Sequence, residues 1–205
     1  MSKSTYHHGH LAQALVDAAL KLVERGGAEA VSLRDLAQSL GVSRAAPYRH
    51  FADRDALLAT VAARGFDDLV ALYEAALAGS GDGRARLRAG GRAFYDFATQ
   101  RPGLYRLMFE SNLLNRDPPP EVLLAPAQKS YRLVWELVAG AYPDADETEV
   151  KVRTIIMTST THGFLALDHV GRFRPFMYEP LTHDQMVAAV MRAAMGISIK
   201  GATES

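Results

Sequence analysis

The sequence predicts an all-α protein, and three observations lead to this prediction. Apolar residues recur every three or four positions through most of the 205 residues, which is the spacing of one face of a helix. A sustained alternation of apolar and polar residues, which would predict strands, is hard to find. A glycine pair, a run of three prolines and several helix-capping residues separate the apolar segments. We therefore expect a series of helices joined by loops.

The first two predicted helices have clear start and stop signals. An apolar stripe over residues 11–23 ends at the glycine pair Gly26-Gly27, a common helix stop. A short helix follows over residues 33–40. Ser32 is its expected N-cap, and Asp35 stands in the capping-box position three residues later.

A helix-turn-helix is predicted between Ser32 and Leu58. Gly41 allows the tight turn after the second helix, and Ser43 is expected to cap a third helix, Arg44–His50, before Phe51 enters the core. The third helix suits a major groove, because its exposed side chains can donate to phosphates and base edges. The alternative is a short surface helix without that role. The candidate DNA contacts are Ser32, Ser43, Arg44, Ala45, Tyr48, Arg49, His50 and Arg54.

The remainder, residues 59–205, is predicted to be a larger helical domain after an N-terminal domain of residues 1–58. Asp53 is expected to cap a long helix, and the capping box Thr182-x-x-Gln185 begins the last one. The segment with three consecutive prolines must be a loop, since prolines do not continue a helix. We expect helices over residues 54–78, from about 84 to before Pro102, and over 104–110, 124–138 and 147–170, with a final helix from 182. The expected loops cover residues 115–120, 143–146 and 172–180.

Composition excludes several function classes. The 23 basic and 23 acidic residues cancel, so net charge gives no support for nucleic-acid binding. Without cysteine the chain has no disulfide, thiolate metal site or cysteine nucleophile. The first residues lack the apolar core of a signal peptide, and no apolar run approaches the roughly 18 residues of a membrane-spanning helix. We therefore expect a cytoplasmic protein that does not enter a membrane.

Residues 11–58 resemble the DNA-binding domain of the TetR family of bacterial regulators. The family implies an all-helical homodimer whose three N-terminal helices bind a palindromic DNA operator. It also implies phosphate contacts from Tyr48, His50 and Arg54, and base contacts from Arg44 and Ala45. The resemblance is carried by Ser32-Leu33-Arg34-Asp35-Leu36-Ala37, Gly41-Val42-Ser43, Tyr48-Arg49-His50-Phe51 and Asp53-Arg54-Asp55-Ala56-Leu57-Leu58.

Two positions depart from the family pattern. Arg54 stands where the family usually has lysine, which keeps the positive charge. Pro47 replaces an aliphatic residue, and as the fourth residue of the predicted helix it is near the limit at which a missing N–H is tolerated. We therefore expect Pro47 to tighten or distort the start of the recognition helix.

A second resemblance points to a small-molecule effector. Tyr105-Arg106-Leu107-Met108-Phe109 and Thr161-His162-Gly163 resemble a TetR subgroup marked by Trp-His-Gly, with Thr161 in place of tryptophan. Bulky and partly polar side chains on separate helices suit a cavity, although such residues are also common in ordinary cores. The candidate effector-binding residues are Tyr105, Met108, Phe109, Trp135, Met157, Thr161 and His162.

The last two predicted helices are expected to form a homodimer interface. Small residues allow close approach of helices, either between two protomers or within one chain. On the first of these helices they are Thr158, Ser159, Thr160, Thr161 and Gly163, and on the second Ala188, Ala189, Ala193, Ala194 and Gly196.

We expect a ligand-responsive transcriptional regulator, a repressor of an operator on double-stranded DNA, and not an enzyme. No catalytic constellation is present, and no cofactor is expected. His7, His8 and His10 could bind a metal, but we interpret them as solvated or close to DNA phosphates, and we expect no metal site. The alternative is an all-helical small-molecule-binding protein or enzyme without DNA-binding activity.

Overall fold

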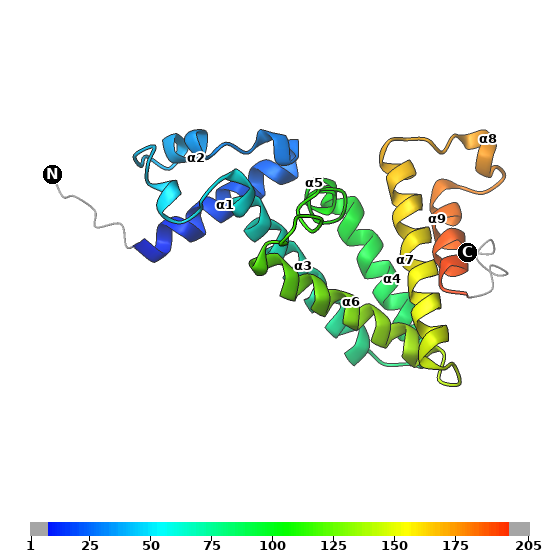
Figure 1. Cartoon of the computed structure of the whole chain (residues 1–205). Coiled ribbons are helices and arrows are strands. Elements are labelled where there is room, and N and C mark those ends of the chain that lie inside the picture. The colour runs from blue at the N-terminus through cyan, green and yellow to red at the C-terminus, as the bar shows by residue number, and fades with distance from the viewer. Residues whose placement is uncertain (1–7, 197–205) are drawn as a thin grey trace. The chain divides into compact units, whose positions relative to one another are not determined.

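The computed structural model describes residues 8–196, and every regular element among them is a helix, which confirms the predicted fold class (Figure 1). No helix within this range is long and apolar enough to cross a membrane. The elements are α1 (His8–Gly26), the 3-10 helix η1 (Ala28–Ala30), α2 (Leu33–Ser39), the 3-10 helix η2 (Pro47–Arg49), α3 (Arg54–Ala78), α4 (Gly83–Gln100), α5 (Pro102–Phe109), α6 (Glu121–Ala141), α7 (Glu147–His169), α8 (Pro175–Tyr178) and α9 (His183–Ala194).

The expected caps determine where several helices begin. The Ser32 hydroxyl accepts a hydrogen bond from the Asp35 N–H at 3.4 Å, and the Asp53 carboxylate accepts one from the Ala56 N–H at 2.7 Å. Thr182 and Gln185 exchange the two hydrogen bonds of a capping box. Each cap contributes roughly 1 kcal/mol, because it satisfies a backbone N–H that has no partner within the helix.

The third predicted helix is wrong in its type and length. Residues 44–46 form a turn, and only Pro47–Arg49 are helical, in a 3-10 helix. Pro47 has no N–H to donate to the Ser43 carbonyl, which would be the first α-helical bond here. The Ala46 N–H makes a tighter bond to that carbonyl instead, at 2.9 Å.

Two other elements also differ from the expectation. α5 begins at Pro102 rather than at residue 104, because proline is well tolerated at the first position of a helix. The aromatic-rich loop over residues 172–180 contains the short helix α8, which again begins at a proline, Pro175.

The chain folds into two compact units that do not coincide with the two predicted domains. The first unit contains Met1–Asp68 and Arg101–Lys129, and the second contains Leu69–Gln100 and Ser130–Ser205. The predicted boundary after residue 58 falls inside α3, which is continuous from Arg54 to Ala78.

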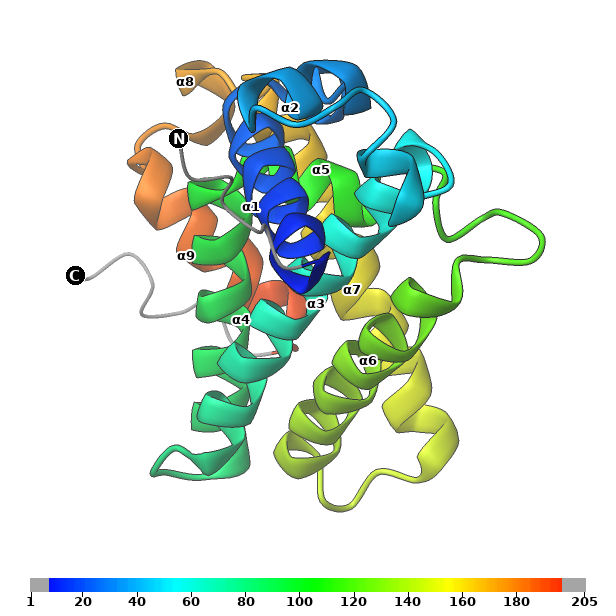
Figure 2. The same ribbon diagram turned by 90° about the vertical axis from the view of Figure 1, so that its left-hand side faces the viewer.

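In the first unit, α1 packs against α2, η1, η2 and α5 (Figure 2). Leu15, Leu36 and Leu57 are almost fully buried in its core. In the second unit, α9 packs against α7, α4 and α8. Leu87 of α4, Val138 of α6 and Leu165 of α7 are buried there. Each unit therefore has an apolar core of its own.

Candidate functional site

The segment from Ser43 to His50 presents polar side chains on a buried apolar base. Tyr48 is 57% exposed although it is a large aromatic residue, whereas Pro47 and Phe51 on either side are buried. An exposed tyrosine hydroxyl between arginines is able to donate to phosphate oxygens. The predicted contact residues Ser43, Arg44, Ala45 and Arg49 are also exposed, and Ser32 and His50 are partly exposed.

Backbone hydrogen bonds close the turns on both sides of this segment. The Val42 N–H donates to the Ala37 carbonyl at 3.0 Å, which closes the turn after α2, and Gly41 takes the left-handed conformation with φ of 67°. The Phe51 N–H donates to the Pro47 carbonyl at 3.0 Å and closes the turn that follows η2. The segment is therefore short but well anchored.

Arg54 has partners that the sequence did not suggest. Its guanidinium donates to two backbone carbonyls, through Nε to Val31 at 2.9 Å and through Nη2 to Ala28 at 2.5 Å. It also forms an ion pair with Asp55 at 3.4 Å. A lysine ammonium lacks the fork that binds two fixed acceptors at once, which gives a reason for arginine at this position.

The start of α5 is bound tightly to α1 and α3. Arg101 forms ion pairs with Glu24 of α1 at 2.7 Å and with Asp68 of α3 at 2.6 Å. Gly103 is buried, and a Cβ added there would overlap the carbonyl oxygen of Val23. This joint was not predicted from the sequence. The only available signal was the Arg-Pro-Gly tripeptide at a helix start.

The predicted effector residues of the first unit are part of an aromatic cluster. Tyr105 is 1% exposed, and Met108 is also buried. The Phe109 ring contacts those of Tyr105 and Phe66 at centroid distances of 5.3 and 5.2 Å. Burial raises the pKa of the Tyr105 phenol well above its ordinary value. The packing is that of a core, which was the alternative interpretation of these residues.

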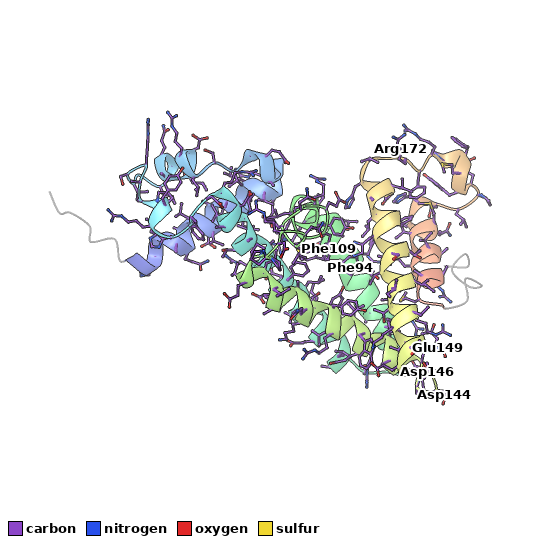
Figure 3. All side chains as sticks on the ribbon, viewed as in Figure 1. Phe94, Phe109, Asp144, Asp146, Glu149 and Arg172 are labelled. Atoms are coloured by element: carbon purple, nitrogen blue, oxygen red, sulfur yellow. The ribbon has the colours of Figure 1, made fainter. Side chains whose placement is uncertain are left out.

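The predicted effector residues of the second unit are less tightly packed. His162 is partly buried, and its ring meets that of Phe94 edge-on, with 5.2 Å between the ring centroids. Figure 3 labels Phe94 of this unit, and Phe109 of the first unit. Burial lowers the pKa of His162 to about 4, so its imidazole is neutral at neutral pH. Thr161 is buried and Trp135 is half-buried.

Met157 lines a pocket of about 90 Å³ in the second unit. Tyr142 and Arg153 supply polar groups to its wall, with the Arg153 guanidinium 4.1 Å from the centre of the Tyr142 ring. The Tyr142 hydroxyl donates to the Met195 carbonyl at 2.5 Å. This volume is well below the roughly 300–1,000 Å³ of typical ligand sites, so the pocket holds only a few atoms as it stands.

One side of α7 is exposed along its length, and we call it the α7 face. It is free of charged residues and follows helical spacing. Val152, Ile155 and Ile156 are about half exposed, at 49%, 55% and 55%. Its members are Val152, Ile155, Ile156, Ser159, Thr160, Gly163, Ala166, Leu167 and Val170.

The α7 face includes only part of the small-residue set predicted for a dimer. Ser159, Thr160 and Gly163 are exposed on it, whereas Thr161 is buried inside the protomer. On α9, Ala188 and Ala193 are exposed and Ala194 is buried. The large apolar members of the face were not predicted from the sequence, although their spacing of three and four residues was an available signal.

Within residues 8–196, no group of three or more histidine, cysteine, aspartate or glutamate side chains is placed to hold a metal ion. The histidine cluster at the start of the chain lies largely outside the described side chains, since His7 is not described and nothing is known of the His8 side chain.

Comparison with known proteins identifies the family. Residues 15–61 match the model of the tetR family of bacterial regulatory proteins, and residues 87–194 match the tetracyclin repressor-like C-terminal domain. The chain belongs to the TetR family. It is therefore a member of a family of DNA-binding transcription regulators, as the helix-turn-helix residues indicated.

Relatives of this TetR-family chain differ in what is known of them. Over 100 residues it is 37% identical to the HTH-type transcriptional activator FasR of Mycolicibacterium smegmatis, covering 49% of this chain and 45% of FasR. The chain thus spans about half the length of the curated relative it matches. A protein of unknown function from Rhodococcus sp. RHA1 is 30% identical, with a TM-score of 0.77 over 95% of this chain and 98% of that one. The TetR-family regulator PfmR of Thermus thermophilus is 22% identical, with a TM-score of 0.62 over 89% and 97% of the two chains, and this likeness concerns the fold.

Proposed function

We propose that this TetR-family protein regulates transcription by binding an operator on double-stranded DNA as a homodimer, and that a small molecule controls the binding. The observation that carries the proposal is the exposed segment Ser43–His50, which presents Arg44, Tyr48 and Arg49 on an anchored base. A cytoplasmic location belongs to the same proposal.

In this proposal most of the affinity for DNA comes from phosphate contacts, so it falls steeply with salt. Tyr48→Ala removes an exposed phenol and should weaken binding to all sequences about equally, by roughly 1 kcal/mol. Tyr131→Ala is a matched control, because Tyr131 is 48% exposed on α6. Fluorescence anisotropy with promoter fragments and random duplexes measures both variants. Absence of DNA binding by the parent protein would support the alternative of a helical small-molecule-binding protein or enzyme.

Arg54 is proposed to serve DNA binding in two ways. Its charge stands near the start of α3, and its two carbonyl bonds fix the backbone between α1 and α2. Arg54→Lys keeps the charge and loses the fork, whereas Arg54→Ala loses both. If phosphate contact is the main contribution, the lysine variant binds DNA as well as the parent. If the backbone bonds dominate, both variants are less stable to heat.

The homodimer is proposed to form through the α7 face. Val152, Ile155 and Ile156 are about half exposed, and no member of the α7 face is charged, which favours contact with another apolar surface. A two-fold dimer requires a surface that complements itself, and a helix face without charged members and with small residues near its middle can provide one.

The effector is proposed to bind in the second unit beside Met157. Thr161 lies one turn further along α7, on the same side of that helix, and His162 follows it. Because the Met157 pocket is small, an effector must widen it, and the wider form must be incompatible with DNA binding. The likeness of Thr161-His162-Gly163 to the Trp-His-Gly subgroup supports this part of the proposal. Met157→Trp should fill the pocket and abolish the response to the effector while DNA binding remains.

Repression and activation are both candidate outcomes of DNA binding. We propose repression, as expected from the family resemblance, and the similarity to FasR, named as an activator, favours the second candidate. Transcription in vitro from a promoter that the protein binds separates the two. A fall in transcript on adding the protein supports repression, and a rise supports activation.

A further inference from the structure

The α7 face complements itself when two copies are placed antiparallel. A two-fold axis beside Thr161 sets Val152 opposite Val170, and Ser159 opposite Gly163. The same register sets the large Ile156 opposite the small Ala166. Each end of α7 then lies against the other end of the partner's α7.

The segment after α7, residues 171–180, is held at its two ends and exposed in its middle, and we call it the arm. The Phe173 ring stacks on Phe164 of α7, with 4.9 Å between centroids and 20° between planes. The Tyr178 ring meets the His183 ring of α9 edge-on, with 6.2 Å between the centroids. Between these anchors, Phe176 is 80% exposed and Met177 is 56% exposed. A fixed segment that presents two large apolar side chains has the form of a contact site.

The two ends of α7 differ in charge. The arm carries Arg172 and Arg174, both exposed, and its acidic residue Glu179 follows the exposed tip. The segment 144–149 at the other end carries four acidic residues and no basic one. Figure 3 shows Arg172 at one end of α7, and Asp144, Asp146 and Glu149 at the other.

A hollow at the acidic end offers a place for the apolar tip of the arm. It is lined by Asp146, Thr148, Glu149, Val152, Arg153 and Ile156, and therefore joins the α7 face to the acidic residues. Two of the acidic residues already have basic neighbours, since Glu147 pairs with Lys151 and Glu149 with Arg153, both at 2.6 Å. Asp144 is exposed and lines a second hollow, which shares Glu149 with the first.

From these features we propose that each arm docks on the partner subunit, with Phe176 and Met177 in the hollow at the start of the partner's α7, and with Arg172 and Arg174 beside its acidic residues. The inference rests on the proposed homodimer through the α7 face. The arm follows Val170 in the chain, and the hollow includes Val152 and Ile156 of the α7 face. Both ends of each α7 are thus covered by the second copy.

Disulfide trapping tests the docking directly, because the chain has no native cysteine. The double variant Thr148→Cys/Phe176→Cys should give a covalent dimer on mild oxidation. Within one protomer these positions are separated by about 30 Å of α7, so they cannot bridge, since a disulfide needs Cα atoms within about 7 Å. Each single variant should stay uncrosslinked. Ser159→Cys, near the proposed axis, reports on the α7 face alone.

The trapping outcomes separate the two proposals. Crosslinking of both the double variant and Ser159→Cys supports the docking. If Ser159→Cys crosslinks and the double variant does not, the docking is overturned, whereas the proposed dimer is supported. If sedimentation shows an unmodified monomer at micromolar concentration and neither variant crosslinks, the homodimer itself is overturned.

Charge reversal gives an independent measurement of the same contact. Arg172→Glu/Arg174→Glu should raise the dimer dissociation constant by about tenfold, as expected for pairs at the rim of an interface. Adding Asp144→Lys, which leaves the Glu149–Arg153 pair intact, should recover part of the loss, which a merely structural role of the arginines would not allow. Arg132→Glu, an exposed arginine on α6, is the control and should leave the constant unchanged. Equal dissociation constants for parent and reversed arm would contradict the docking.

Discussion

Pro47 shows how one residue changes the recognition segment. The sequence pattern around it is that of a short α-helix, and the apolar side of that helix is preserved, because the proline ring is buried where the family has an aliphatic side chain. The missing N–H nevertheless converts the first turn into a tighter one. Ala45 and Arg44 are therefore presented from a turn.

Restoring the amide should change which DNA sequence is preferred. In Pro47→Leu the N–H can donate to the Ser43 carbonyl, and residues 44–50 should become α-helical. Arg44 and Ala45 then point in new directions, so affinity for an operator selected with the parent should fall about tenfold, while random DNA binds as before. Anisotropy with both duplexes measures the ratio. Pro126→Leu, at the proline within α6, is the control, and an unchanged ratio in Pro47→Leu would contradict the role of Pro47.

His162 should make the second unit sensitive to acid. Burial lowers its pKa to about 4, whereas the unfolded chain has an ordinary histidine pKa of about 6.5. Protonation therefore favours the unfolded chain. The stability is complete above about pH 6.5 and falls as the pH decreases toward 4, by at most about 1.4 kcal/mol per pH unit. Urea unfolding at several pH values should show a shallower slope for His162→Gln, and equal slopes would show that His162 does not titrate in this way.

At the scale of the elements, helix positions followed from the sequence wherever a cap or a break was local. Ser32, Asp53 and Thr182 each begin a helix through a hydrogen bond to a residue three positions away, so the pattern is visible in the sequence. The contacts of Arg101 and Arg54 could not be predicted, because their partners are distant in the sequence. Glu24 is 77 positions from Arg101, and Ala28 is 26 positions from Arg54. The predicted DNA contacts lie in one short segment, so the sequence alone could group them, whereas the predicted effector residues depend on packing between distant helices.

The joint between α5 and α1 gives a prediction about stability. Gly103→Ala places a Cβ against the Val23 carbonyl, where backbone and not a flexible side chain must move. We expect a loss of several kcal/mol in the free energy of unfolding. Gly140→Ala is the control, because a Cβ at Gly140 in α6 meets nothing within 4 Å, and there alanine should stabilise the helix by up to about 1 kcal/mol. Thermal unfolding compares the two variants, and equal melting temperatures would refute the close contact.

At the scale of the whole molecule, the proposed dimer should be required for operator binding. Ile155→Glu puts a carboxylate on the α7 face, and burying it without a partner costs several kcal/mol. We expect a monomer by light scattering and the loss of tight operator binding, since each half-site then binds alone. Val122→Glu on α6 is the control, because Val122 is 48% exposed outside that face. If the Ile155→Glu variant were still a dimer, the interface would have to lie on another surface.

The first unit is built from two separate stretches of chain, and this has a consequence for how the protein is made. Arg101 and Gly103 reach back to Glu24 and Val23, so α1 lacks these neighbours until α5 has been synthesised. At roughly 5–20 residues per second, the wait between residue 24 and residue 103 is about 4 to 16 seconds of translation. During this time the apolar side of α1 has no α5 to cover it. The ribosome-bound chain should therefore be open to chaperones until α5 emerges.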